Sequence, residues 1–192
     1  SEDKIVNIII FGPPGAGKGT QAKHLVNKLN SFQVSTGDML RDEIQKDTDI
    51  GKKIITNMND GKFVDDIIVN KLLEKIIFDK SKTNKLIFDG YPRTISQAKK
   101  LDDLLNKSNQ KINFVIFLNV HKDQIVKRVE KRKLLEKRSD DDANTILKRY
   151  DTYMEITKPV LDYYSKNKNF HEVDGSLKIN DISQKIEEIL GV

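Results

Sequence analysis

The sequence predicts an α/β domain in which helices cover both faces of a parallel β-sheet. Short apolar runs typical of buried strands alternate with longer segments whose apolar residues recur at helical spacing. A glycine-rich stretch, GPPGAGK (residues 12–18), follows the first apolar run and precedes a helical segment. The chain of 192 residues is long enough for one such domain with small insertions.

Five segments are expected to form strands, because each is short, apolar and bounded by turn residues. Parallel strands are joined by right-handed crossovers, and ligands bind beyond their carboxyl ends. Three polar motifs follow predicted strands: the glycine-rich stretch, STGD (residues 35–38) and DGYPR (residues 89–93). These motifs are therefore expected to meet in one cleft. The predicted strands span residues 4–11, 32–35, 85–90, 113–120 and 170–173.

The segments between the strands favour helices. The first helix is expected to end at Leu29, with Asn30 in the left-handed conformation that commonly follows a helix. Thr36 and Asp38 are expected to cap the second helix. The predicted helices span residues 17–29, 36–45, 49–58, 65–78, 95–107, 122–132 and 141–166, and a last one carries isoleucines 179, 182, 186 and 189 on one side.

The composition excludes several kinds of site. There is no cysteine, so the chain has no disulfide and no thiolate metal site. The three histidines, His24, His121 and His171, show no ligand spacing, so neither a histidine metal site nor a histidine base is expected. The apolar runs are far shorter than the roughly 20 residues that span a bilayer, and no basic segment precedes an apolar one at the start. We therefore expect a cytoplasmic protein without a membrane partner.

A net charge of +5 and a pI near 9.1 raise the question of nucleic-acid binding. Acidic residues alternate with the lysines, and no stripe of basic residues interleaved with aromatic ones is present. The pattern favours a lysine-rich surface, with arginines around an anionic substrate, over a nucleic-acid partner. A monomer is expected, because no heptad seam remains after the core is assigned.

The glycine-rich stretch has the pattern of a phosphate-binding loop, Gly12-x4-Gly17-Lys18. Glycines let backbone N–H groups face phosphate oxygens, the following helix adds partial positive charge, and the lysine can reach a β- or γ-phosphate. The next residue is Gly19, where a strict loop of this kind has Ser or Thr to bind magnesium. A magnesium ion is therefore expected to depend on phosphates, water and three nearby groups: Thr20, Asp89 and, second to it, Asp38.

Such a loop predicts only that a nucleotide binds. The Asn-Lys-x-Asp element of GTPases and the signature of transporter ATPases are absent from the sequence. Arginines point further, because the planar guanidinium binds phosphate through paired hydrogen bonds and stays charged. The candidate phosphate-binding arginines are Arg41, Arg93, Arg128, Arg132, Arg138 and Arg149.

In order and spacing, the motifs resemble those of the adenylate kinase family across essentially the whole chain. They are GPPGAGKGT (12–20), STGDMLR (35–41), GKFV (61–64), DGYPRTISQA (89–98), KRSDDD (137–142) with Arg149, and VDGS (173–176). The resemblance implies a P-loop NTPase-type three-layer sandwich around a five-stranded parallel sheet. It also implies two mobile inserts within a single domain, 1–192: residues 35–64 would cover the monophosphate, and residues 131–141 would form a short lid over ATP. Without cysteine, this lid differs from the long zinc-binding lid of some relatives.

The same resemblance implies reversible phosphoryl transfer from Mg-ATP to AMP, giving two ADP. Arg128 would stack on the adenine of ATP, while Arg138 and Arg149 would bridge the phosphates of both nucleotides. The implied catalytic set is Lys18, Asp89, Arg93, Arg132, Arg138 and Arg149. The implied ATP-binding set is Gly15, Ala16, Gly17, Lys18, Gly19, Thr20, Arg128, Arg132 and Leu177. The implied AMP-binding set is Thr36, Arg41, Lys62, Phe63, Val64, Gly90, Tyr91, Pro92, Arg93, Gln97, Arg138 and Arg149.

Several alternatives stay open at this point. A UMP/CMP kinase has the same fold, but such relatives tend to carry Ala and Asn where this chain has Thr36 and Gln97, and a glutamine amide suits an adenine edge. A GTP-using AMP kinase and a non-catalytic nucleotide-binding module are further readings. Lys133 and Lys137 stand where short-lid relatives usually carry glycines, which affects the expected movement of the lid rather than the chemistry.

Overall fold

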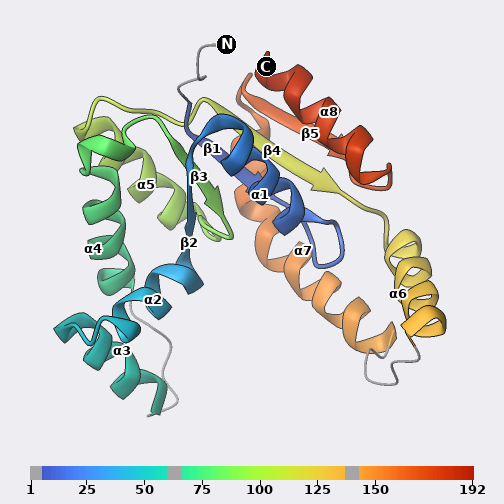
Figure 1. The fold of residues 1–192 in the computed structure, drawn as a ribbon, viewed down its shortest axis with the longest axis horizontal. Helices are drawn as coiled ribbons and strands as arrows, with labels where there is room; N and C mark the ends of the chain where they lie inside the picture. The colour runs from blue at the N-terminus through green and yellow to red at the C-terminus, as the bar shows by residue number, and fades with distance from the viewer. Residues whose placement is uncertain (1–5, 60–65, 137–142) are drawn as a thin grey trace.

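The computed structural model describes residues 6–59, 66–136 and 143–192 (Figure 1). Within these ranges, five parallel strands form a single sheet in the order β2-β3-β1-β4-β5. This confirms the predicted fold class. The strands are β1 (Ile8–Phe11), β2 (Phe32–Ser35), β3 (Leu86–Asp89), β4 (Phe114–Asn119) and β5 (Phe170–Asp174).

The strand predicted over residues 4–11 begins at Ile8, so its extension to residues 6 and 7 was wrong, and residues 4 and 5 lie outside the described ranges. Asn7, fully buried, uses its polar groups elsewhere: its backbone N–H donates to the side-chain oxygen of Asn113 at 2.9 Å. Its own side-chain oxygen accepts a hydrogen bond from the backbone N–H of Leu86 at 3.1 Å. Asn7 thus ties together the amino ends of neighbouring strands, at the edge of the sheet opposite the predicted ligand side.

The helices agree closely with the predicted segments. Asn30 follows the first helix in the left-handed conformation, with φ of 50°, as predicted. The sixth helix continues to Glu136 instead of ending at Arg132, so the start of the segment expected to form a lid is helical. In the described part of the chain the helices are α1 (Lys18–Leu29), α2 (Thr36–Gln45), α3 (Asp49–Asn59), α4 (Asp66–Ile77), the short 3₁₀-helix η1 (Lys80–Lys82), α5 (Ile95–Lys107), α6 (Lys122–Glu136), α7 (Ala143–Ser165) and α8 (Ile179–Leu190).

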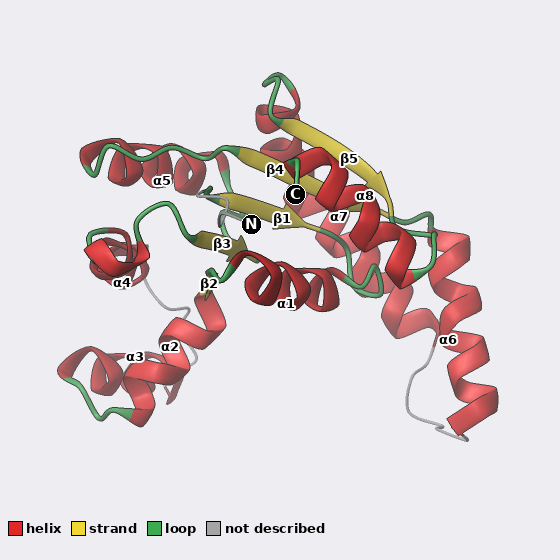
Figure 2. Ribbon diagram, turned by 45° about the horizontal axis from the view of Figure 1, so that its top comes forward, coloured by secondary structure: helices red, strands yellow, loops and turns green. Residues whose placement is uncertain are grey.

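Two hydrophobic clusters hold the helices on the two faces of the sheet. Alternate residues of a strand point to opposite faces, so Ile9 and Ile10 of β1 belong to different clusters. Helices α4, α5 and α7 pack on the face of Ile9, and α1 and α8 pack on the face of Ile10 (Figure 2). The arrangement is the predicted three-layer sandwich. Helices α2 and α3 extend away from the sheet on one side, and α6 with the first part of α7 on the other (Figures 1 and 2).

None of the helices in the described ranges combines the length and the apolar character that crossing a membrane requires.

The connection between β1 and α1 turns sharply at two glycines. Gly15 and Gly17 have φ of 88° and 80°, a left-handed conformation that residues with a side chain rarely adopt. Between them, the backbone N–H of Ala16 donates to the carbonyl of Pro13 at 3.0 Å and closes the turn. Helix α1 then begins at Lys18, with Gly17 as its N-cap and no capping side chain. The first N–H groups of α1 are therefore left for another partner, as in an anion-binding loop.

Two neighbouring glycines should respond differently to replacement by alanine. A Cβ added at Gly17 or at Gly19 would meet no other atom within 4 Å. The two positions therefore differ only in backbone conformation. Gly17→Ala is expected to lower the free energy of unfolding by about 1–2 kcal/mol, because an alanine is strained at a φ of 80°. Gly19 lies inside α1, where Gly19→Ala is expected to leave stability unchanged or raise it by up to about 1 kcal/mol. Chemical denaturation measures both, and equal losses would contradict this account.

Candidate active site

A cavity of about 830 Å³ lies between the β1–α1 connection and one side of α7. Gly90, Pro92 and Arg93, which follow β3, line it from a third direction. This volume is in the range of small-molecule sites. The cavity brings together the glycine-rich stretch and DGYPR, two of the three motifs that were predicted to meet. Most of the loop residues that line it were predicted as site residues. The predicted site residues that line the cavity are Gly15, Gly17, Lys18, Gly19, Thr20, Gly90, Pro92, Arg93 and Arg149.

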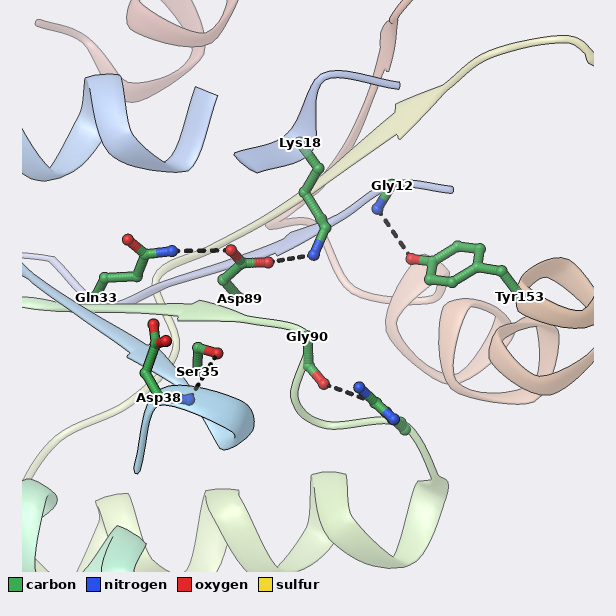
Figure 3. Close-up of polar contacts among 9 residues, drawn as sticks. Gly12, Lys18, Gln33, Ser35, Asp38, Asp89, Gly90 and Tyr153 are labelled. Carbon is green, nitrogen blue, oxygen red and sulfur yellow. Dashed lines mark hydrogen bonds and ion pairs between the residues drawn. The ribbon is translucent and has the colours of Figure 1, made fainter. Parts of the chain in front are cut away.

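Lys18 and Asp89 form an ion pair beside the cavity (Figure 3). The parallel register places Asp89, the last residue of β3, opposite Ile10 of β1, two residues before the glycine-rich loop. The second carboxylate oxygen of Asp89 accepts a hydrogen bond from the side-chain amide of Gln33 on β2 at 2.9 Å. The side chain of Asp89 is 12% exposed and that of Lys18 is 25% exposed, so each charge depends on the other for compensation.

The DGYPR motif forms a compact turn between β3 and α5. Gly90 has a positive φ of 79°, the Tyr91–Pro92 peptide bond is cis, and the side chain of Tyr91 is buried. The guanidinium of Arg93 donates through Nε to the carbonyl of Gly90 at 3.0 Å, which leaves its terminal nitrogens for other partners. The turn thus fixes the start of the arginine side chain at the rim of the cavity.

Gln97 is oriented by its protein neighbours. Its side-chain oxygen accepts a hydrogen bond from the backbone N–H of Arg93 at 2.8 Å, and its side-chain nitrogen donates to Asp66 at 3.1 Å. Thr94 caps α5 by accepting a hydrogen bond from the backbone N–H of Gln97. The amide predicted to read an adenine edge is therefore held in a defined orientation, with a second N–H and a second lone pair that a base could use.

The STGD motif lies at the start of α2, outside the lining of the cavity. The cap of α2 is Ser35, whose hydroxyl accepts from the backbone N–H of Asp38 at 3.5 Å, so the predicted cap at Thr36 and Asp38 was wrong by one residue. The carboxylate of Asp38 pairs with Arg41, one turn further along the exposed side of α2.

Arg128 on α6 connects the glycine-rich loop to the loop after β5. Its two terminal nitrogens donate to the carbonyls of Gly15 at 2.8 Å and Gly175 at 2.6 Å. Leu177, just beyond, packs against the cluster on the α1 and α8 face. Arg132 lies one turn after Arg128 on the same helix and is exposed.

Some predicted residues lie outside the described ranges, namely Lys62, Phe63, Val64, Lys137 and Arg138, and the side chain of Lys133 is likewise not described. Conversely, sequence reasoning missed several residues near the cavity. Gln33, which holds Asp89, gave no signal in the sequence. The missed residues on α7 lie at helical spacing from Arg149, and that spacing could have found them: Thr145, Lys148, Thr152, Tyr153, Ile156 and Thr157.

Comparisons with known proteins agree with this arrangement. The family model described as Adenylate kinase matches residues 10–169. A protein named Adenylate kinase from Pelagibacter ubique is 47% identical, over 97% of this chain and 100% of its own length. A protein of the same name from Mycoplasma mycoides subsp. mycoides is 40% identical, over 93% of this chain and 93% of its own length. Another from Thermosipho africanus is 33% identical, over 97% of this chain and 99% of its own length. With most of its length matched by the family model and by such relatives, this chain belongs to the adenylate kinase family.

Proposed function

We propose that this chain catalyses the reversible transfer of a phosphoryl group from Mg-ATP to AMP, giving two ADP. The observation that carries the proposal is the single cavity that joins the glycine-rich loop and Lys18 to Arg93 and Arg149. Family membership and the names of the relatives support the same reaction.

The chemistry suits a site without a general base. The attacking oxygen belongs to a phosphate whose second pKa is about 6, so it is already anionic near neutral pH. Phosphoryl transfer then rests mainly on alignment of the two phosphates and on compensation of their charge. Two nucleotides bring roughly six negative charges into one cleft. Lys18 of α1 and Arg149 of α7 both line the cavity, and their positive charges would offset the repulsion between the two phosphate chains.

The assignment of residues to the two nucleotides follows the family resemblance. The loop residues Gly15–Thr20, with Arg128, Arg132 and the backbone near Leu177, would bind ATP. The turn at Gly90–Arg93, with Gln97, and the start of α2 would bind AMP. Arg132 and Arg138 would add positive charge from the segment 131–141 when it covers the site. These roles, like the division into inserts, are part of the proposal.

A magnesium ion fits the residues that are present. In the described residues, no group of three or more His, Asp or Glu side chains could hold a metal, but Mg²⁺ commonly uses one or two carboxylates together with water and substrate phosphates. Asp89, next to Lys18, is the carboxylate that would hold it, and the exposed Asp38 is the second candidate. When bound, Mg²⁺ would offset part of the negative charge of the phosphates. Lys18 would then exchange its bond to Asp89 for a bond to phosphate.

Measuring ADP formation tests the proposed reaction. The protein is expected to form ADP from Mg-ATP and AMP, and to form little product when CMP or UMP replaces AMP, because the Gln97 amide suits an adenine edge. Arg149→Met, which removes one cation from the cavity, is expected to lower kcat by about 10³-fold. The measurement is a coupled ADP assay with each acceptor. Absence of ADP from the purified protein would overturn the proposal, and faster turnover of CMP or UMP would favour a pyrimidine nucleotide kinase.

Titration with magnesium tests the role of Asp89. Asp89→Asn keeps the shape of the side chain but removes its charge, so the Mg²⁺ concentration that gives half the maximal rate is expected to rise about tenfold. Asp103→Asn on α5 is the matched control: Asp103 is half-exposed and, among the described residues, pairs with the surface residues Lys100 and Lys107, so the substitution should leave the titration unchanged. Identical titrations for Asp89→Asn and the unchanged protein would contradict this role.

A further inference from the structure

A hydrogen bond joins the first glycine of the loop to helix α7. The backbone N–H of Gly12 donates to the hydroxyl of Tyr153 at 2.9 Å (Figure 3). Gly12 is buried and directly follows β1, so its N–H lies where the sheet ends and the loop begins. A buried N–H without a partner is costly, and Tyr153 supplies that partner from a helix far along the chain.

The same side of α7 carries other residues of the cavity. Arg149 lies one turn before Tyr153 and Thr157 one turn after it, a spacing that puts all three on one side of the helix. All three line the cavity together with Gly12. The hydrogen bond therefore connects two walls of the same cavity: the loop that carries Lys18 and the helix that carries Arg149.

A tyrosine is chemically suited to this position. Burial raises the pKa of Tyr153 to about 12, with smaller effects from its neighbours, so the hydroxyl stays neutral at physiological pH. It can accept the hydrogen bond of Gly12 without adding a negative charge to the cavity in which the phosphates are proposed to bind. A carboxylate in the same place would accept the bond equally well but would repel the ligand.

We propose that Tyr153 is a positioning residue that sets the distance between the phosphate loop and Arg149. It acts through Gly12 and through the helix that it shares with Arg149, not by contact with the reacting atoms. The inference rests on the proposed phosphoryl transfer, a reaction whose rate depends on alignment. A displacement of about 1 Å can lower such a rate by about 10²-fold.

Removal of the hydroxyl alone tests the proposal. Tyr153→Phe keeps the ring and is expected to lower kcat by about 10- to 100-fold, while KM for ATP and AMP changes by less than about threefold. The amide proton of Gly12 should shift upfield in the NMR spectrum, because it loses its acceptor. The rates are measured below the unfolding transition of each variant, so that a loss of stability is not read as a loss of alignment.

Two other tyrosines of α7 provide matched controls. The hydroxyl of Tyr150 donates to the carbonyl of Val120 at 2.9 Å, which is not part of the loop. The hydroxyl of Tyr164 is buried, with no hydrogen-bond partner among the described residues. Tyr150→Phe and Tyr164→Phe are expected to keep kcat within about twofold. A loss of kcat in Tyr150→Phe equal to that in Tyr153→Phe would indicate a general effect of altering the helix and would overturn the proposal.

A double-mutant cycle separates positioning from mere support of the fold. If Tyr153 acts by placing the loop relative to Arg149, Tyr153→Phe should lower kcat much less in an Arg149→Lys background than in the unchanged protein. An equal fold-decrease of kcat in both backgrounds would overturn the positioning role. So would an unchanged kcat in Tyr153→Phe when the Gly12 amide resonance has shifted. If the unchanged protein forms no ADP, the proposed function itself fails, whereas an active protein with an active Tyr153→Phe variant refutes this inference alone.

Discussion

The ion pair between Lys18 and Asp89 is the interaction on which the rest of the site depends. A lysine side chain that is three-quarters buried needs an anion beside its ammonium, and Asp89 supplies one. The pair exists because β1 and β3 are neighbours in a parallel sheet, so the loop after one strand meets the last residue of the other. A phosphate that enters the loop offers the ammonium a second anion of higher charge. The carboxylate released in this way is then next to the phosphates, where a divalent cation would need an oxygen ligand.

The fold could be predicted from the sequence because its signals are local. Short isoleucine-rich and phenylalanine-rich runs bounded by polar residues produce strands buried on both faces, and β3 and β4 lie within one residue of where such runs predicted them. Helix α5 matches its predicted bounds, because its apolar residues recur at helical spacing over that whole segment. The meeting of the glycine-rich loop with Gly90–Arg93 was also predictable, since both follow strands of one parallel sheet. The membership of the adenylate kinase family, inferred from motifs, is confirmed.

The features that could not be predicted depend on contacts between residues far apart in the chain. Gly12 and Tyr153 are 141 positions apart, and no local pattern marks a tyrosine on α7 as the partner of a loop glycine. Gln33 is an ordinary polar residue of an edge strand until the sheet places Asp89 beside it. Strand β1 is shorter than its apolar run because Asn7 forms hydrogen bonds with the side chain of Asn113 and the backbone N–H of Leu86. The roles of the site residues, the two inserts, the cytoplasmic location and the monomeric state stay predictions.

The central claim is that one cavity holds a donor and an acceptor nucleotide end to end, with the cations of α1 and α7 offsetting their repulsion. Calorimetric titration with an analogue that joins two adenosines through five phosphates tests it most directly. We expect one analogue to bind per chain and to compete with both ATP and AMP. Two analogues bound per chain, or an analogue that displaces ATP while AMP still binds, would show that the nucleotides do not share one cavity and would contradict the account.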